Sequence, residues 1–267
     1  MIKTCSHEDY HELMHYLEQE PVYHTFIISD IAQYGFDKDY QTVYLQKSEN
    51  RCCGIFLRYY NNFIVAGDTN EIIVQEIVPL ITSEITTIMG KADLVDRICS
   101  GLKRDYTYEQ KMLYILEKGN EVQEEQIASR SIRIAGLEDV DRIYEFLMGI
   151  EQLRALYSQK AMIENRIRSG EGIHIIMEEE GTVIAHGNSA ASTDRTVMLG
   201  GIGVLPSYRR QGIGKKIINR LCQEILKKDK TPCIFTGDAN VIAMCSELGF
   251  TEYGMWATAQ ANHNELC

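Results

Sequence analysis

Basic residues are scarce in this sequence relative to acidic ones. Lys and Arg together number 27 against 38 Asp and Glu, which gives a net charge of −11 at pH 7. Such a charge repels both the phosphate backbone of a nucleic acid and an anionic membrane surface. We therefore expect neither a nucleic-acid partner nor a membrane partner.

Long apolar runs are also missing. No stretch approaches the ~18 apolar residues that a membrane-spanning helix needs. The opening residues, MIKTCSHEDYHELMHYL, contain no unbroken apolar core of signal-peptide length. The sequence predicts a cytoplasmic protein.

The sequence contains cysteines, but none of them has the spacing of a zinc site. The chain has eight cysteines, but none forms a CxxC pair or a Cys/His pair with the spacing of a zinc site. Most of them lie in apolar segments, where a free thiol behaves as a small hydrophobic group. We expect structural thiols rather than disulfides, and no metal.

The length of the chain allows two domains. Its 267 residues, 45% of them hydrophobic, are enough for two domains of ordinary size or for one large domain. The polar stretch 119–130 is the best candidate for a linker. We predict an N-terminal domain at residues 1–126 and a C-terminal domain at 127–267.

The second half alternates strand and helix patterns. It contains predicted strands at 131–135 and 195–205, a hairpin that turns at Glu180-Gly181, and two further strands at 232–236 and 253–259. Predicted helices occupy LEDVDRIYEFLMGI, SQKAMIENRIRSG, the segment after Lys216, and 239–248. The fold class that these elements indicate is α/β with a mixed sheet flanked by helices.

The first half repeats this order more loosely. Two predicted helices, HEDYHELMHYLEQ and VYHTFIISDIAQYG, precede a three-stranded meander in QTVYLQKSENRCCGIFLRYYNNFIVAG. A helix then follows in TNEIIVQEIVPLI, and a strand, a helix and a strand follow that. The matching order suggests an internal duplication.

Positive charge and glycine concentrate in one short loop, YRRQGIGKK, residues 208–216. The loop follows a strand that Pro206 ends, and an amphipathic helix follows the loop. Free N–H groups at a helix N-terminus, with glycines that permit close approach, favour an anion. A diphosphate would fit this loop. Neither G-x-x-x-x-G-K-[ST] nor G-x-G-x-x-G is present.

The same stretch resembles the acyl-CoA-binding motif of the GNAT superfamily of N-acetyltransferases, R/Q-x-x-G-x-G/A after a strand that ends V-x-P. RRQGIG, residues 209–214, matches every position, and Val204-Leu205-Pro206 precedes it. Downstream, DANVIAMCSELGF is similar to the family's second motif, a short helix that ends in L-G-F. The resemblance covers residues 131–259. The corresponding turn in the first half, AGDTNE, is acidic, so the sequence suggests two GNAT-like domains in tandem with a degenerate first domain that holds no CoA in that turn.

The resemblance implies acetyl-CoA as the acyl-donor co-substrate. Two parallel strands that diverge, here 195–205 and 232–236, would hold it between them. Its pantetheine arm would pair with the backbone of three strand residues, and loop amides and cations would bind its diphosphate. The first residue of the short helix after the second strand would approach the arm near its thiol. The residues so assigned are Ile202, Gly203 and Val204 for the arm, Arg209, Arg210, Gln211, Gly212, Ile213, Gly214 and Lys215 for the diphosphate, and Asp238 or Asn240 near the thiol.

The usual catalytic groups of the family are missing from their places. A Glu often stands on the strand before the loop as general base, but this chain has MLGGIG at 198–203. Many members have a Tyr five residues before the Phe of L-G-F as acid, but this chain has Cys245 there. The substitutes we consider are His186 as base, Glu151 as amine ligand or base, and Cys245 as acid. For all three, a structural or solvent-exposed role is the more frequent alternative, and alignment of the reactants alone can lower the barrier.

Three functions remain open on this sequence. The first is N-acetylation of a primary amine on a small molecule or peptide by direct transfer in a ternary complex. The second is a non-catalytic acyl-CoA sensor or assembly module, and the third is a scaffold that binds no CoA. The N-terminal domain would wall one side of the acceptor cleft or mediate formation of a homodimer.

Overall fold

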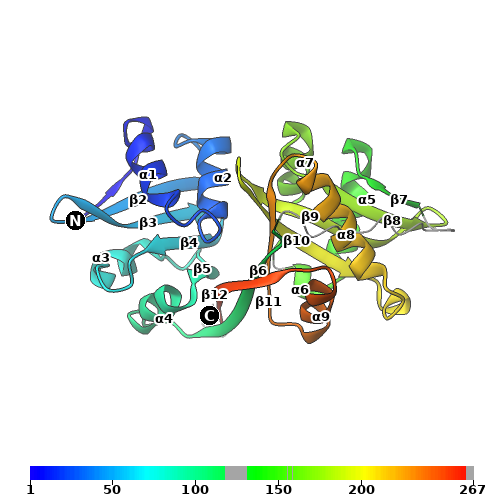
Figure 1. Cartoon of the computed structure of the whole chain (residues 1–267). Helices are drawn as coiled ribbons and strands as arrows, with labels where there is room; N and C mark the ends of the chain where they lie inside the picture. Colours follow the sequence, from blue (N-terminus) through cyan, green and yellow to red (C-terminus); the bar gives the residue numbers. More distant parts are fainter. Residues whose placement is uncertain (118–130, 155, 158, 263–267) are drawn as a thin grey trace. The chain divides into compact units, whose positions relative to one another are not determined.

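The computed structural model describes residues 1–117, 131–154, 156–157 and 159–262, and these residues form two compact units (Figure 1). The first unit comprises residues 1–113, 235–237 and 252–262. The second comprises the described residues of 114–234 together with residues 238–251. The predicted boundary at 126/127 lies outside the described residues.

The first unit contains a mixed sheet in the order β1-β2-β3-β4-β5-β12-β6. Neighbouring strands are antiparallel from β1 to β4, and β4 pairs with β5 in parallel. Hydrophobic residues from both strands and helices build its core, for example Phe56, Phe63 and Ile98. The strands are β1 (Ile2–Thr4), β2 (Gln41–Ser48), β3 (Arg51–Tyr59), β4 (Asn62–Gly67), β5 (Thr87–Lys91) and β6 (Tyr106–Ile115); the helices are α1 (Tyr10–Leu17), α2 (Thr25–Tyr34), α3 (Val74–Ile77) and α4 (Ala92–Ser100).

The last strand of the chain, β12 (Thr251–Ala261), lies in the sheet of the first unit. It is coloured red in Figure 1 and pairs with β5 in antiparallel register from Trp256↔Lys91 to Gln260↔Thr87. Ala257 and Ala259 belong to the core of that unit. The sequence places residues 127–267 in one domain, whereas this strand is part of the other unit. A strand's hydrophobic alternation shows which face it buries and does not identify its partner.

The second unit contains the strands β11-β10-β9-β8-β7. Only β10 and β11 are parallel, and the other neighbours are antiparallel. The predicted hairpin turn at Glu180-Gly181 is confirmed, since both residues have positive φ angles between β8 and β9. The elements are β7 (Ser131–Ile134), α5 (Val140–Met148), α6 (Glu151–Arg154), α7 (Lys160–Ser169), β8 (His174–Glu179), β9 (Thr182–Ser192), β10 (Thr196–Val204), α8 (Ile213–Leu226), β11 (Thr231–Thr236) and α9 (Ala239–Glu247).

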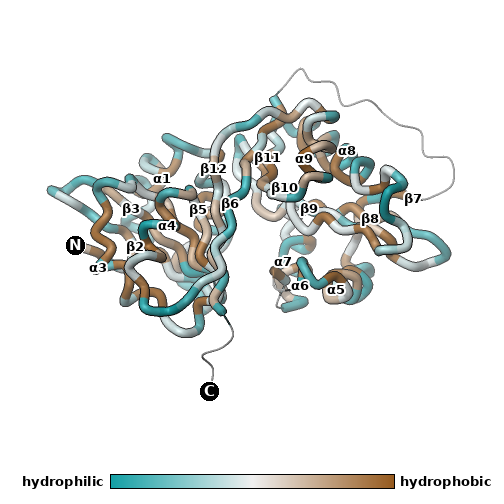
Figure 2. Tube along the Cα trace, turned by 90° about the horizontal axis from the view of Figure 1, so that it is seen from below, coloured by the Kyte–Doolittle hydropathy of each residue, from teal (hydrophilic) through white to brown (hydrophobic). Residues whose placement is uncertain are grey.

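Hydrophobic burial explains these elements. Along α8 the apolar residues Ile217, Leu221 and Ile225 are fully buried, at the i, i+4, i+8 spacing of one helix face. Figure 2 shows the alternation of hydrophobic and hydrophilic residues along the chain. The mixed α/β class predicted from the sequence is confirmed. Among the described residues, no helix is both long and apolar enough to cross a membrane.

Candidate functional site

A gap opens between the two parallel strands of the second unit. β10 and β11 pair over three residues only, from Thr196↔Thr231 to Met198↔Cys233. β10 then continues to Val204 along β9 alone, with Val204 opposite Ala185. Among the residues that the structure describes, the β11-facing side of residues 200–204 therefore has no strand partner in register. An extended molecule could pair with that backbone as an added strand would.

A bulge lies at the mouth of this gap. The register between β10 and β9 shifts between Gly200 and Gly203, and Gly201 has a φ of 56°, in the left-handed region that favours glycine. A Cβ atom at Gly201 would lie 2.4 Å from the hydroxyl of Tyr157. That hydroxyl donates a hydrogen bond to Asn188 Oδ1 at 3.0 Å. Only glycine fits this position without displacing the Tyr157–Asn188 pair.

The basic loop has the backbone of an anion site. Arg210 and Gly212 have φ angles of 61° and 72°, and Gly212 is the N-cap of α8. Nothing lies within 4 Å of a Cβ placed on Gly212, so the loop is open to solvent there. The first N–H groups of this 14-residue helix have no partner within the helix and point out of its end. Such an open, positive helix end favours an anion.

The cations of the loop are differently engaged. Arg209 Nε donates to the Val204 carbonyl at 3.1 Å, and Lys215 Nζ forms an ion pair with Glu247 at 2.9 Å. Arg210 is exposed at the left-handed position. The first two contacts fix the loop against β10 and α9 respectively. They leave Arg210 as the loop cation most open to an incoming anion.

Asp238 caps the N-terminus of α9. Its carboxylate accepts hydrogen bonds from the backbone N–H of Asn240 at 2.7 Å and of Val241 at 3.3 Å. Asn240 also donates from its side chain to the same oxygen. Both residues are exposed. Their assignment near the thiol of the co-substrate remains a prediction, and the structure adds a capping function for Asp238.

His186 lies in the core of the second unit, with both ring nitrogens engaged. Nδ1 is 2.8 Å from the Gly201 carbonyl oxygen, and Nε2 is 2.9 Å from His174 Nδ1. The side chain is fully buried, and burial lowers its pKa to about 4 although the bond to Gly201 raises it. A general base needs a free lone pair within reach of its substrate. The structure gives no support to the prediction that His186 is that base.

Cys245 and Glu151 have opposite environments. Cys245 is fully buried, and burial raises its pKa to about 11, so packing explains it better than proton donation. Glu151 is exposed at the first residue of α6. Nearby Ile150 and Leu153 reach the strand: a Cβ on Gly203 would lie 2.6 Å and 3.0 Å from their Cδ1 atoms. Of the three candidates, Glu151 alone is accessible to an acceptor.

Sequence reasoning missed three buried polar residues beside Gly201. These are His174, Asn188 and Tyr157, and the first two are 1% exposed. Burial raises the pKa of the Tyr157 phenol to about 12, so it is protonated near neutral pH. His186 and Asn188 lie two residues apart, on one face of β9, and His174 pairs with Asn188 across β8 and β9. The alternation in HGNSAA could have indicated Asn188.

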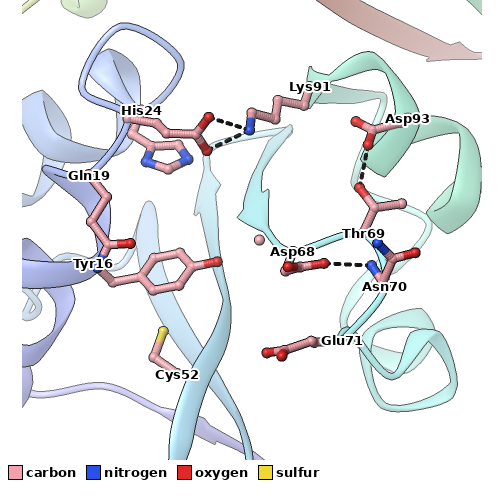
Figure 3. A pocket seen from close by; sticks show the side chains of 12 residues that line it. Tyr16, Gln19, His24, Cys52, Asp68, Thr69, Asn70, Glu71, Lys91 and Asp93 are labelled. Atoms are coloured by element: carbon pink, nitrogen blue, oxygen red, sulfur yellow. Dashed lines mark hydrogen bonds and ion pairs between the residues drawn. The ribbon is translucent and has the colours of Figure 1, made fainter.

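The first unit has a pocket of different character (Figure 3). It has a volume of about 330 Å³ and lies where β4 and β5 end, at Gly67 and Lys91. The ammonium of Lys91 is paired with Glu20. Three further carboxylates line the pocket: Asp68, Glu71 and Asp93. This charge opposes a diphosphate.

A family model and several solved structures match this chain. Residues 138–250 match the model of the acetyltransferase (GNAT) family. No curated protein matches the chain. The family match spans the gap, the bulge and the basic loop.

Solved structures match the chain along nearly its whole length. A GCN5-related N-acetyltransferase-like protein from Streptococcus suis is 13% identical with a TM-score of 0.67, and the match covers 96% of this chain and 99% of that one. A tandem GNAT protein from the clavulanic acid biosynthesis pathway is 10% identical with a TM-score of 0.64, covering 97% of both chains. A GNAT-family acetyltransferase from Colwellia psychrerythraea is 17% identical with a TM-score of 0.54, covering 98% and 99%. At these identities the likeness concerns the fold. Together, the comparisons show that residues 138–250 are similar to the acetyltransferase (GNAT) family and that the chain has a fold similar to these solved structures.

Proposed function

We propose that the protein is an acetyl-CoA-dependent N-acetyltransferase that acts on a primary amine. The observation that carries this proposal is the gap between β10 and β11, which ends at the open N-terminus of α8. An extended arm with a diphosphate at one end requires a strand edge beside an anion site. Both lie in the second unit, within the residues that match the family.

The reaction proceeds by direct transfer in a ternary complex. The amine nitrogen forms a bond to the acetyl carbon, the carbon–sulfur bond breaks, and the electron pair leaves with sulfur. The amine loses a proton to water or to a carboxylate, and the thiolate takes one from water. Glu151 is the accessible carboxylate on α6 and would bind the acceptor as an ammonium ion. The chain then supplies alignment and backbone donors.

The acceptor remains an amine of unassigned identity. Acetyl-CoA incubated with a panel of small amines and basic peptides tests the proposal, with mass spectrometry of the products and measurement of released CoA. We expect an acetylated amine with stoichiometric CoA. Binding of acetyl-CoA with CoA release no faster than in buffer would contradict it.

A second function is favoured by the burial of His186 and Cys245. With both remote from solvent, the chain would act as an acyl-CoA sensor that binds without turnover. Thermal stabilisation by acetyl-CoA with no product from any amine is the outcome expected of such a sensor. The absence of any stabilisation would contradict both functions.

A further inference from the structure

We infer that His174 and His186 form a positioning pair that holds the Gly201–Ile202 peptide so that the Ile202 N–H faces the thioester oxygen of acetyl-CoA. The inference rests on the proposed function and assigns to these two residues a role in it. It replaces the catalytic role that the sequence suggests for His186.

The hydrogen bonds determine which nitrogen carries each proton. The Gly201 carbonyl can only accept, so His186 Nδ1 donates to it at 2.8 Å. The remaining nitrogen of a neutral His186, Nε2, then accepts from His174 Nδ1 at 2.9 Å. Both imidazoles are thus protonated on Nδ1. The chain of bonds runs from His174 through His186 to Gly201.

This chain ends inside the protein. His174 Nε2 is buried and has no hydrogen-bond partner among the residues that the structure describes. A proton relay to solvent would need an acceptor or donor there. The arrangement therefore suits a device that fixes a carbonyl and not one that conducts protons.

The surroundings keep the pair neutral. His174 is 1% exposed and His186 fully buried, and the ring of Phe146 on α5 lies 6.2 Å from that of His186. Burial lowers both pKa values, and the guanidinium of Arg166 on α7 lowers that of His174 further. A neutral His186 can donate from one nitrogen while it accepts with the other. Protonation would break its bond to His174.

The fixed carbonyl sets the direction of the next amide. In a trans peptide the C=O and the following N–H point in opposite directions. The Gly201 carbonyl points toward the His186 imidazole, so the Ile202 N–H points away from that ring. β10 has β9 on one side and the gap on the other beyond Met198. Neither Gly201 nor Ile202 has a register partner in β9. The Ile202 N–H is therefore not engaged by register pairing with β9, and we infer that it serves a molecule bound in the gap.

A donor in this place stabilises the negative charge that develops on the acetyl oxygen when the amine attacks. The bulge that presents the donor depends on a second contact on the same side of β10. Tyr157 and Asn188 hold their hydrogen bond where a Cβ of Gly201 would lie. The peptide is thus fixed by a hydrogen bond to its carbonyl and by close packing on its α-carbon.

Two substitutions of His186 separate positioning from packing. His186→Leu keeps a similar volume and removes both hydrogen bonds, whereas His186→Asn keeps a donor near the place of Nδ1. The measurement is the ratio of the dissociation constants for acetyl-CoA and CoA by calorimetry, because only the former has the acetyl oxygen. We expect His186→Leu to weaken acetyl-CoA about fivefold relative to CoA. We also expect kcat to fall about tenfold with little change in the KM of the amine. His186→Asn should retain most of the parent's preference for acetyl-CoA over CoA and most of its kcat.

His24→Leu is the matched control. His24 in the first unit is also buried and donates from Nδ1 to one backbone carbonyl, that of Leu17, at 2.8 Å. The His24→Leu protein should be less stable, but its ratio of dissociation constants for acetyl-CoA and CoA should equal that of the parent. A folded His186→Leu protein with the parent's ratio and kcat would overturn the inference while binding by the parent upholds the proposed function. If the parent bound neither acetyl-CoA nor CoA, the proposed function would fail and the inference with it.

A measurement on the parent protein without ligand tests the inference even if the variants do not fold. Nitrogen-15 spectra of the parent should show both imidazoles neutral and protonated on Nδ1 at pH 7, the less common tautomer in water. Protonation on Nε2 of His186 would overturn the inference whatever the variants show.

Discussion

Each unit contains a pair of parallel neighbouring strands, and the two pairs differ in the number of residues over which they remain paired. β4 and β5 pair over four consecutive residues, from Asn62↔Thr87 to Val65↔Gly90. β10 and β11 separate after three, and β10 bulges at Gly201. In the first unit the parallel strands remain in register almost to the end of β4 at Gly67.

The segments that follow β4 and β10 also differ between the two units. β4 leads into residues 68–71, which include the carboxylates of Asp68 and Glu71, and then into the four-residue helix α3. β10 leads into a basic loop and the 14-residue α8. A strand edge, an anion site and a long helix occur together in one unit and not in the other. The comparison teaches that the proposed acyl-CoA site depends on two features that the first unit lacks: the separation of two parallel strands and a basic loop beyond them.

The largest effect should come from closing the anion site. Gly212→Asp adds a carboxylate and a side chain where the backbone must approach the diphosphate. We expect acetyl-CoA to bind about 100-fold more weakly, roughly 3 kcal/mol, measured by calorimetry. Gly181→Asp is the matched control, since Gly181 also has a positive φ and open space around it in the same unit. Equal losses in both variants would show that the loop is not the site.

Two glycine substitutions test the strand pairs separately. A Cβ on Gly90 would lie 2.5 Å from the Val65 carbonyl oxygen, and a Cβ on Gly201 would lie 2.4 Å from the Tyr157 hydroxyl at a positive φ. We expect each Ala variant to lose about 2 kcal/mol of unfolding free energy in urea. Only Gly201→Ala should also weaken acetyl-CoA binding. Weaker binding in Gly90→Ala would contradict the assignment of the site to the second unit.

The buried His186 should make stability depend on pH. Its pKa is about 4 in the folded chain and near 6.5 when unfolded, so the unfolded state takes up the proton first. Its contribution to stability is present above pH 6.5 and is lost as the pH falls from 6.5 to 4. Between pH 7 and pH 5 we expect a loss of about 2 kcal/mol from this group. His186→Asn should show a smaller loss in urea unfolding at the two pH values; an unchanged loss would mean that other groups cause it.

The smallest effect is expected from adding positive charge to the first unit. Asp68→Arg with Glu71→Arg replaces two exposed carboxylates beside the pocket of Figure 3. Because β4 and β5 remain paired, we expect no second acetyl-CoA site, and calorimetry should still give one molecule per chain. A stoichiometry of two would show that loop charge alone decides between the units.

Much of the fold could be predicted from periodicity. The three-stranded meander at 41–67 and the hairpin at Glu180-Gly181 are confirmed, because each depends on local hydrophobic alternation or turn chemistry. The helix predicted after Lys216 is also present, but it begins earlier, at Ile213. The predicted helix in TNEIIVQEIVPLI is only partly helical, as α3 and a 3-10 turn that begins at Val78. Pro79 removes a backbone donor there.

The site was only partly predictable for a physical reason. The basic loop is a local signal, since its glycines and cations lie within nine residues. The His174–His186–Gly201 chain joins three strands, and no short stretch shows that these residues meet. His186 and Cys245, the predicted base and acid, are both fully buried. From the sequence alone, a His or Cys within an apolar strand or helix can face either the core or a ligand cleft.

The position of β12 has a consequence for how the protein is made. The first unit takes residues 252–261 into its sheet, between β5 and β6, although some 140 residues of the other unit are translated in between. Until β12 has been synthesised, β5 and β6 lack the strand that lies between them in the finished sheet. Their backbone edges are then exposed while the ribosome synthesises the second unit. Dividing the gene within the predicted linker, residues 119–130, would leave the N-terminal product without β12 and give the C-terminal product a strand that belongs to the other sheet.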